Sequence, residues 1–223
     1  IGYSAAISAC EKAAQWQLAV ALLARMPRLG LQLSDFSYNA AISACEKASQ
    51  WQLALGLFVQ MKQKQISLGA VTYNAVLDAL HGQPFALHVF CEALQGGHYP
   101  GLMRKTWPPL LDLHDMSVVS GTLAVWWWLH EVLPSTLLAK AQRPRPFTVI
   151  TGWGKHRATW SVKSVKVTVE HFTEQLVLRR LPRTGKRGKG SLTFAPRAGQ
   201  VAREQLGIPL PERDPRASKC NDA

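Results

Sequence analysis

Asp112 and His114 are the residues of this chain whose types and spacing best suit acid–base chemistry. They alternate with two leucines in the run LLDLH, residues 110–114. Alternate side chains of a strand point to opposite faces, so the leucines would share one face and the carboxylate and imidazole the other. Asp112 would then orient the imidazole or hold a divalent cation such as Mg²⁺. His114 would act as a general base or acid on a hydroxyl group or a water.

A second group of candidate residues lies about forty residues further along, in the run GWGKHR. Its members are Gly152, Trp153, Gly154, Lys155, His156 and Arg157. The glycines allow the backbone to approach a phosphate closely, and the residues after them add positive charge. This run therefore predicts a phosphate-binding loop. Two simpler interpretations stay open: His114 only ends a strand, and the glycine run is an ordinary strand-to-helix turn.

These residues need secondary-structure elements that bring them together. The apolar patterns predict strands over 110–114, 146–151 and 191–195. They predict helices over 117–133, 161–177 and 199–206. Strand and helix alternate, which is typical of a small α/β sandwich with at least partly parallel strands. Sites in parallel sheets lie beyond the C-terminal ends of the strands, so His114 and the glycine loop would converge on one crevice.

The first half of the chain contains an internal repeat. The segment from Tyr3 to Ala19 recurs from Tyr38 to Ala54, with fifteen of seventeen residues identical and an offset of 35 residues. The pattern restarts at Tyr73. Each unit contains two short amphipathic helices, which must stack on neighbouring units to bury their apolar faces. The fold class that we expect is therefore α plus α/β: a helical-hairpin solenoid followed by a small α/β sandwich.

Helical spacing predicts which side chains of the second repeat are buried. The expected buried residues are Tyr38, Ala41, Ile42 and Cys45 in the first helix, and Leu53, Leu57, Phe58 and Met61 in the second. Cys10 and Cys45 occupy the same place in the repeat, which favours small buried thiols. The third unit is shortened, because Gly82 and Pro84 break its first helix early. It is expected to form a terminal cap.

Charge is distributed unevenly along the chain. The formal net charge is +12, from 26 basic and 14 acidic residues. Residues 1–139 hold eight of each kind, whereas residues 140–223 hold eighteen basic and six acidic residues. This excess predicts a polyanionic partner, either a nucleic acid or an anionic membrane surface. No apolar stretch is long enough for a transmembrane helix, so we expect no membrane partner.

The first half resembles the pentatricopeptide repeat family. The resemblance rests on Val71-Thr72-Tyr73-Asn74 and Phe36-Ser37-Tyr38-Asn39 opening a first helix, on the run from Trp51 to Met61, and on the 35-residue period. It implies binding of single-stranded RNA at about one base per repeat. By position, the resemblance assigns base reading to Ser4 with Ser34, to Asn39 with Gly69, and to Asn74 in an incomplete third site.

The second half resembles the small MutS-related (Smr) domain found at the C-termini of plant and algal pentatricopeptide proteins. The motifs LDLHDMS and TGWGKH, in that order behind the repeats, support it. The resemblance implies an RNA-cleaving endonuclease, with a DNA nickase or a non-catalytic binding or scaffold factor as alternatives. It also implies a plastid or a mitochondrion as the setting. The metal requirement, the oligomeric state and the target sequence are not indicated.

We therefore expect this domain organisation: repeats over 1–94, a linker over 95–107, the Smr-like domain over 108–207 with a basic insertion at 179–190, and a tail over 208–223. The first residue is Ile1 rather than methionine, so we expect a fragment or a processed product. Further repeats upstream are expected, because solenoids normally need at least three.

Overall fold

The computed structural model describes residues 2–104, 110–132, 147–150, 178–180 and 191–196. The chain divides into two compact units, Ile1–His98 and Tyr99–Ala223. The expected helices over 161–177 and 199–206 lie outside the described residues. No described helix is both long and apolar enough to span a membrane.

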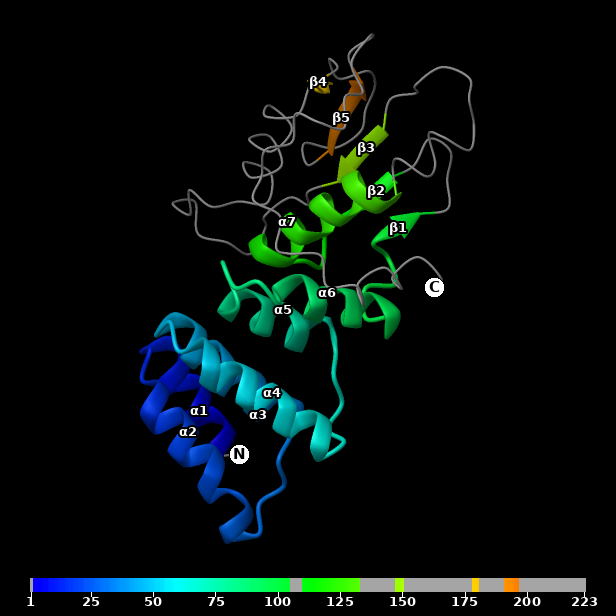
Figure 1. Cartoon of the computed structure of the whole chain (residues 1–223). Helices are drawn as coiled ribbons and strands as arrows, with labels where there is room; N and C mark the ends of the chain where they lie inside the picture. The colour runs from blue at the N-terminus through cyan, green and yellow to red at the C-terminus, as the bar shows by residue number, and fades with distance from the viewer. Residues whose placement is uncertain (1, 105–109, 133–146, 151–177, 181–190, 197–223) are drawn as a thin grey trace. The chain divides into compact units, whose positions relative to one another are not determined.

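The first unit consists of helical hairpins. Their helices are α1 (Gly2–Lys12), α2 (Trp16–Arg25), α3 (Asp35–Lys47), α4 (Trp51–Gln63), α5 (Ala70–Ala79) and α6 (Ala86–Gln95), with a short 3₁₀ turn η1 (Pro27–Leu29) after α2. These bounds confirm two full hairpins and a shorter third one (Figure 1). The helical-hairpin solenoid predicted from the repeat is therefore present.

The first two hairpins turn in the same way between their helices. Ala14 and Ser49, one repeat apart, both adopt the left-handed backbone conformation, with φ of 53° and 57°. The next residue donates back to a helix carbonyl in each case: Gln15 N to Cys10 O at 2.9 Å and Gln50 N to Cys45 O at 2.8 Å. These bonds satisfy carbonyl groups that the helix ends leave free. In the third hairpin, Gly82 has a φ of 78° after the shortened helix.

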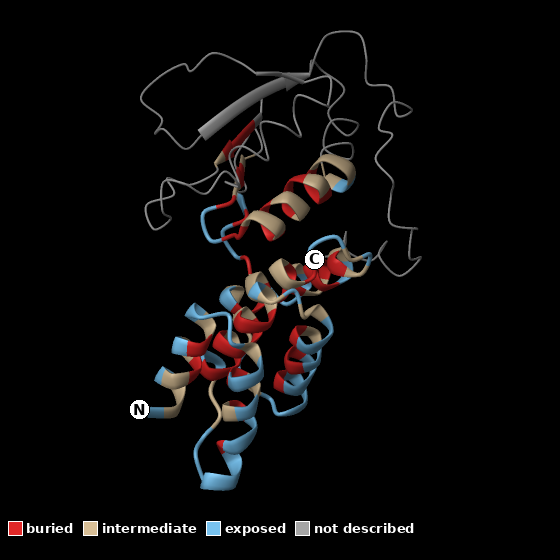
Figure 2. Ribbon diagram, turned by 90° about the vertical axis from the view of Figure 1, so that its left-hand side faces the viewer, coloured by how far each residue is buried: buried red, intermediate tan, exposed pale blue. Residues whose placement is uncertain are grey.

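The first helix of each hairpin packs beside the first helix of the next, so that α3 lies between α1 and α5. This position makes α3 the most extensively buried helix of the unit (Figure 2). The predicted core residues of α3 and α4 are buried, with one exception. Leu53 is 38% exposed, and its neighbour Ala54 is fully buried instead. The prediction for Leu53 was wrong because the buried face of α4 passes through Ala54, Leu57, Phe58 and Met61.

The second unit contains a mixed five-stranded sheet. Its strands are β1 (Met103–Arg104), β2 (Leu110–Asp112), β3 (Phe147–Ile150), β4 (Leu178–Arg180) and β5 (Ser191–Pro196), in the order β1-β2-β3-β5-β4. Only β2 and β3 pair in parallel, and the other three pairs are antiparallel. The expectation of partly parallel strands is thus confirmed for that one pair.

Two of these strands were not expected. β1 lies within the segment 95–107 that the sequence suggested as a linker, and it pairs with β2 through Met103–Leu111 and Arg104–Leu110. β4 includes the first residues of the expected basic insertion, 179–190, and pairs with β5. The domain boundaries themselves stay a prediction.

A helix follows β2 in the sequence. It is α7 (Val118–Trp127), continued by a π-helical turn, η2 (Trp128–Val132). Ser117 caps α7 in a reciprocal capping box with Ser120, because each side chain bonds the other's backbone N–H at 3.2 Å and 2.8 Å. Because Ser117 caps the helix, α7 begins at Val118, and only three residues separate it from His114.

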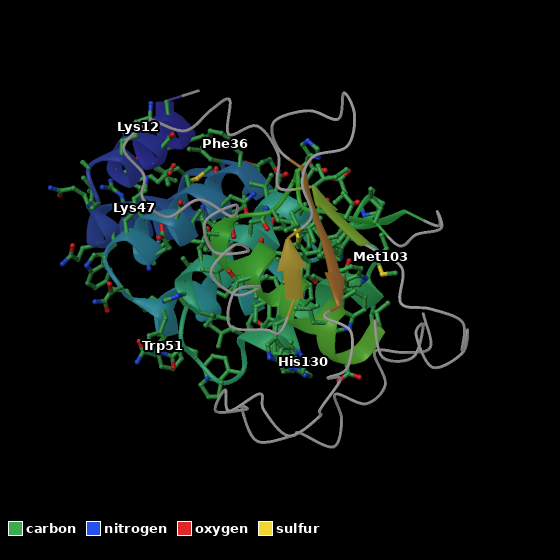
Figure 3. All side chains as sticks on the ribbon, turned by 90° about the horizontal axis from the view of Figure 1, so that it is seen from above. Lys12, Phe36, Lys47, Trp51, Met103 and His130 are labelled. Atoms are coloured by element: carbon green, nitrogen blue, oxygen red, sulfur yellow. The ribbon has the colours of Figure 1, made fainter. Side chains whose placement is uncertain are left out.

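The buried position of α3 predicts a large effect of truncating its core side chains. Ile42 is fully buried, so Ile42→Ala should lower the free energy of unfolding by about 2–4 kcal/mol, since it leaves a cavity between packed helices. Phe36→Ala on the same helix is the control, because Phe36 is exposed (labelled in Figure 3) and its truncation should leave stability nearly unchanged. Urea unfolding followed by circular dichroism measures both. Equal losses in the two variants would contradict this packing.

Candidate nucleic-acid interface

Asp112 and His114 contact each other, although the strand predicted over 110–114 ends at Asp112 and a turn, not strand alternation, places His114. Leu111 and Leu113 are buried, whereas the carboxylate and the imidazole lie together on the other side. Asp112 Oδ1 contacts His114 Nδ1 and also accepts the backbone N–H of His114 at 3.2 Å. Strand β2 ends at Asp112, so His114 lies in the turn just beyond the strand.

Burial differs sharply between the two members of the pair. The Asp112 side chain is 8% exposed and the His114 side chain 48% exposed. An ionised carboxylate can only accept a hydrogen bond, so in a neutral imidazole this contact places the proton on Nδ1 and leaves Nε2 as the acceptor. A nearly buried carboxylate thus orients a solvent-accessible imidazole, which is the arrangement that a general base needs.

The strand beside β2, which precedes the expected loop in the sequence, ends level with β2. Asp112 is level with Ile150 in the parallel pair, and Leu113 N donates to Ile150 O at 2.8 Å. Strand β3 therefore ends beside the turn that carries His114. The predicted phosphate-loop residues, 152–157, are outside the described residues, so this part of the site stays a prediction.

A divalent-cation site is also not established. Within the part of the chain that the structure describes, no group of three or more His, Cys, Asp or Glu side chains is arranged to hold a metal ion. The sequence left two roles open for the Asp112 carboxylate: orienting His114 or binding a metal ion. Its contact with His114 favours the orienting role.

The residues assigned to base reading lie on the repeats in two kinds of position. Ser4, Asn39 and Asn74 occupy the same place on α1, α3 and α5, which pack side by side and so bring them into one row. Ser34 and Gly69 precede α3 and α5 as their N-cap residues. Each proposed pair thus combines one side chain from within a first helix with the residue that begins the next first helix.

The sequence analysis missed a third serine at the first of these pairs. The Ser37 hydroxyl lies 3.0 Å from that of Ser4 and 3.2 Å from that of Ser34, and Ser37 N donates to Ser34 Oγ at 3.3 Å. Ser37 is fully buried and thus holds both hydroxyl groups of the pair in place. Its position three residues after a serine N-cap is a signal that could have identified it.

Acidic side chains lie at the C-terminal ends of the first helices. Glu11 forms an ion pair with Lys47 across α1 and α3, at 3.0 Å. The equivalent residue of the second repeat is Glu46. Its partial burial, with the negative charges of Asp78 and Glu11 nearby, raises the pKa of this carboxyl above the ordinary glutamate value, although Lys47 opposes the shift.

The raised pKa of Glu46 predicts a pH-dependent stability. The folded chain binds this proton more readily than the unfolded chain, so the ionised carboxylate lowers stability above the folded pKa. That loss disappears as the pH falls below the unfolded value, about 4.3. Glu46→Gln should therefore raise the urea midpoint at pH 7 and give no gain near pH 4.

The matched control is Glu11→Gln, one repeat earlier. The Glu11 carboxylate accepts a hydrogen bond from the ammonium group of Lys47. Glu11→Gln should therefore not raise the urea midpoint at pH 7. A gain at Glu46 that persists unchanged to pH 4 would show that the charge is not its cause.

Comparisons with known sequences agree with the repeat architecture. A model of the PPR repeat family matches residues 33–82, and a model of the PPR repeat matches residues 1–31. No curated protein matches the chain. The two matched segments cover the hairpins α1–α2 and α3–α4 together with α5. Residues 1–31 and 33–82 of this chain are therefore similar to pentatricopeptide repeats.

Proposed function

We propose that this protein selects single-stranded RNA with its repeats and cleaves it at the Asp112–His114 pair. Pentatricopeptide repeats indicate RNA binding, and the equivalent residues Ser4, Asn39 and Asn74 carry the hydroxyl and amide groups that can bond base edges, although Oδ1 of Asn39 is buried in this structure. The observation that supports cleavage is the contact between a nearly buried carboxylate and an exposed imidazole.

The proposed chemistry follows from the tautomer that Asp112 imposes. Nε2 of His114 accepts the proton of a ribose 2′-hydroxyl as its oxygen attacks the adjacent phosphorus. The bond from phosphorus to the 5′-oxygen breaks, and the leaving oxygen takes a proton from water. The products are a 2′,3′-cyclic phosphate and a 5′-hydroxyl end. If His114 activates water instead, cleavage leaves a linear phosphate and does not need the 2′-hydroxyl.

The Smr-like character of the second unit is part of this proposal. The order of LDLHDMS and TGWGKH in the sequence supports it, together with the parallel pairing of β2 with β3 and the intervening helix α7. The basic excess of residues 140–223 supports contact with the RNA backbone, and DNA remains the alternative substrate. The organellar setting stays a prediction from the resemblance.

Cleavage is tested with the full chain and labelled single-stranded RNA, with Mg²⁺ and with EDTA. His114→Ala should lower the cleavage rate about 10²- to 10⁴-fold, the range that general acid–base catalysis provides, while binding is retained. Asp112→Asn should also reduce the rate strongly, because an amide can donate to Nδ1 and then favours the wrong tautomer. Asp115→Asn is the matched control, since its carboxylate lies next to the pair in sequence and is exposed.

The outcomes separate the competing functions. Cleavage that survives His114→Ala would show that the catalytic site lies elsewhere or that a contaminant cleaves the RNA. Binding without cleavage in the wild type would favour the non-catalytic scaffold. A single 2′-deoxy substitution at the cut site should abolish cleavage if the 2′-hydroxyl is the nucleophile.

Base selection by the repeats has a separate test. Asn39→Ala should weaken binding of the preferred RNA about 3- to 10-fold, the value of one or two hydrogen bonds, and should reduce discrimination at one base only. Gln60→Ala on the exposed side of α4 is the control and should have no effect. Filter binding against random-sequence RNA pools, followed by sequencing of the bound fraction, measures both. An equal loss for all sequences would mean that Asn39 does not read a base.

A further inference from the structure

Three serine hydroxyl groups lie together where the first two hairpins meet. Ser37 Oγ is 3.0 Å from Ser4 Oγ and 3.2 Å from Ser34 Oγ. Ser37 is fully buried, whereas Ser4 and Ser34 are partly exposed. Two accessible hydroxyl groups are therefore joined beneath the surface by a third one. These three residues are called the serine cluster below.

The burial of Ser37 restricts where its hydroxyl proton can point. A hydroxyl group donates one hydrogen bond and accepts up to two. A buried donor without a partner is costly, so the Ser37 proton goes to Ser4 or to Ser34, the two hydroxyl oxygens that it contacts. In either case the backbone N–H of Ser37 donates to Ser34 Oγ at 3.3 Å.

The two directions of the Ser37 proton give two arrangements of the serine cluster. When Ser37 donates to Ser4, Ser34 donates to Ser37, and the Ser4 proton is left for a ligand. When Ser37 donates to Ser34, Ser4 donates to Ser37, and the Ser34 proton is left instead. Each oxygen keeps its own proton, and rotation about the three C–O bonds converts one arrangement into the other. In both arrangements a ligand meets one donor and one acceptor, on opposite members of the Ser4–Ser34 pair.

We propose that Ser37 couples the hydroxyl groups of Ser4 and Ser34, so that this pair binds base edges of either hydrogen-bonding order and does not distinguish cytosine from uracil. This inference rests on the proposed RNA binding by the repeats. Uracil presents the O4 acceptor beside the N3–H donor, whereas cytosine presents the N4 amino donor beside the N3 acceptor. Rotation of the three hydroxyl groups exchanges the donor and the acceptor of the pair, so it fits both bases. Ser37 is a positioning residue, because it acts through its neighbours.

The next pair along the repeats has no such cluster. Thr72 is buried at the place equivalent to Ser37, but Gly69 stands at the place of Ser34 and has no side chain. Asn39 carries its donor and its acceptor on two different atoms, and the acceptor Oδ1 is buried. Rotation of hydroxyl groups therefore cannot exchange donor and acceptor at this pair. The first pair should tolerate both pyrimidines, and the second should distinguish them.

The experiment measures RNA binding by the full chain with His114→Ala, which keeps the RNA intact. Copies of a bound RNA that each carry one abasic site identify the nucleotide at the first pair. At that nucleotide alone, Ser4→Ala should cause no further loss of affinity, since the base that Ser4 contacts is already missing. The affinities for RNAs with cytosine and with uracil at this place should then agree within about twofold, less than the value of one hydrogen bond.

Two substitutions test the coupling through Ser37. A carboxylate only accepts hydrogen bonds and is a good N-cap, so Ser34→Asp keeps the cap of α3 and draws the Ser37 proton toward itself. Ser4 must then donate to Ser37 and offers a ligand an acceptor only. The affinities for cytosine and uracil should therefore differ by about 3- to 10-fold, the value of one hydrogen bond. Adding Ser37→Ala should remove this preference, because the Ser4 hydroxyl group rotates freely again.

The matched control is Thr72→Ala, which removes the equivalent buried hydroxyl group one repeat later. It should leave the cytosine-to-uracil ratio at the first pair unchanged, with or without Ser34→Asp. Ser37→Ala alone should weaken binding of both bases equally, since it removes the positioning of the pair and not its tolerance.

Three results would overturn the proposal. The first is a wild-type chain that prefers one pyrimidine at the first pair by tenfold or more. The second is a Ser34→Asp variant without a preference, and the third is a preference of that variant that Ser37→Ala leaves intact. A chain that binds no RNA would refute the proposed function as well, whereas these three results refute the coupling alone.

Discussion

The close approach of successive first helices is the constraint on which the repeat unit depends. Ala40 and Ala44 leave little side-chain volume between α1 and α3, so the helices can pack with their backbones near each other. This spacing brings Ser4 within 3.0 Å of Ser37 and Glu11 within 3.0 Å of Lys47. A larger side chain at either alanine would separate the helices, break both contacts and disturb the row formed by Ser4, Asn39 and Asn74.

The same packing explains why the repeat could be predicted accurately from the sequence. A near-exact recurrence after 35 residues requires that equivalent residues have equivalent environments, and the shared turn at Ala14 and Ser49 shows that they do. Leu53 is the exception. Helical spacing alone did not distinguish it from Ala54, because both positions border the same face and only the neighbouring α3 decides which one is covered.

The sheet was less predictable than the helices for a physical reason. β1 and β4 have two and three residues, too few to show an alternating pattern, and they exist because β2 and β5 offer free edges for pairing. Such strands depend on partners distant in sequence, which local propensity does not contain. β2 was predictable from its apolar residues, but its end at Asp112 was not, because the turn that carries His114 depends on the hydrogen bond from the His114 backbone to the Asp112 side chain. Ser37 was missed because its role depends on Ser4, thirty-three residues earlier.

In the proposed function, charge divides the work of RNA binding between the two parts of the chain. Residues 1–98 hold six basic and five acidic residues, so the repeats have almost no net attraction for a polyanion. The ion pairs Lys47–Glu11 and Lys62–Glu92 further engage two of those basic side chains within the solenoid. The excess lies in residues 140–223, and in the proposed function its charge would supply the salt-dependent, sequence-independent part of the affinity. The repeats are left with short-range contacts through hydroxyl and amide groups, which contribute little affinity but distinguish one base from another. A short solenoid would then distinguish RNA sequences effectively only when the basic segment keeps the RNA close to the repeats. Joining the two parts in one chain raises the effective concentration of the RNA at the repeats.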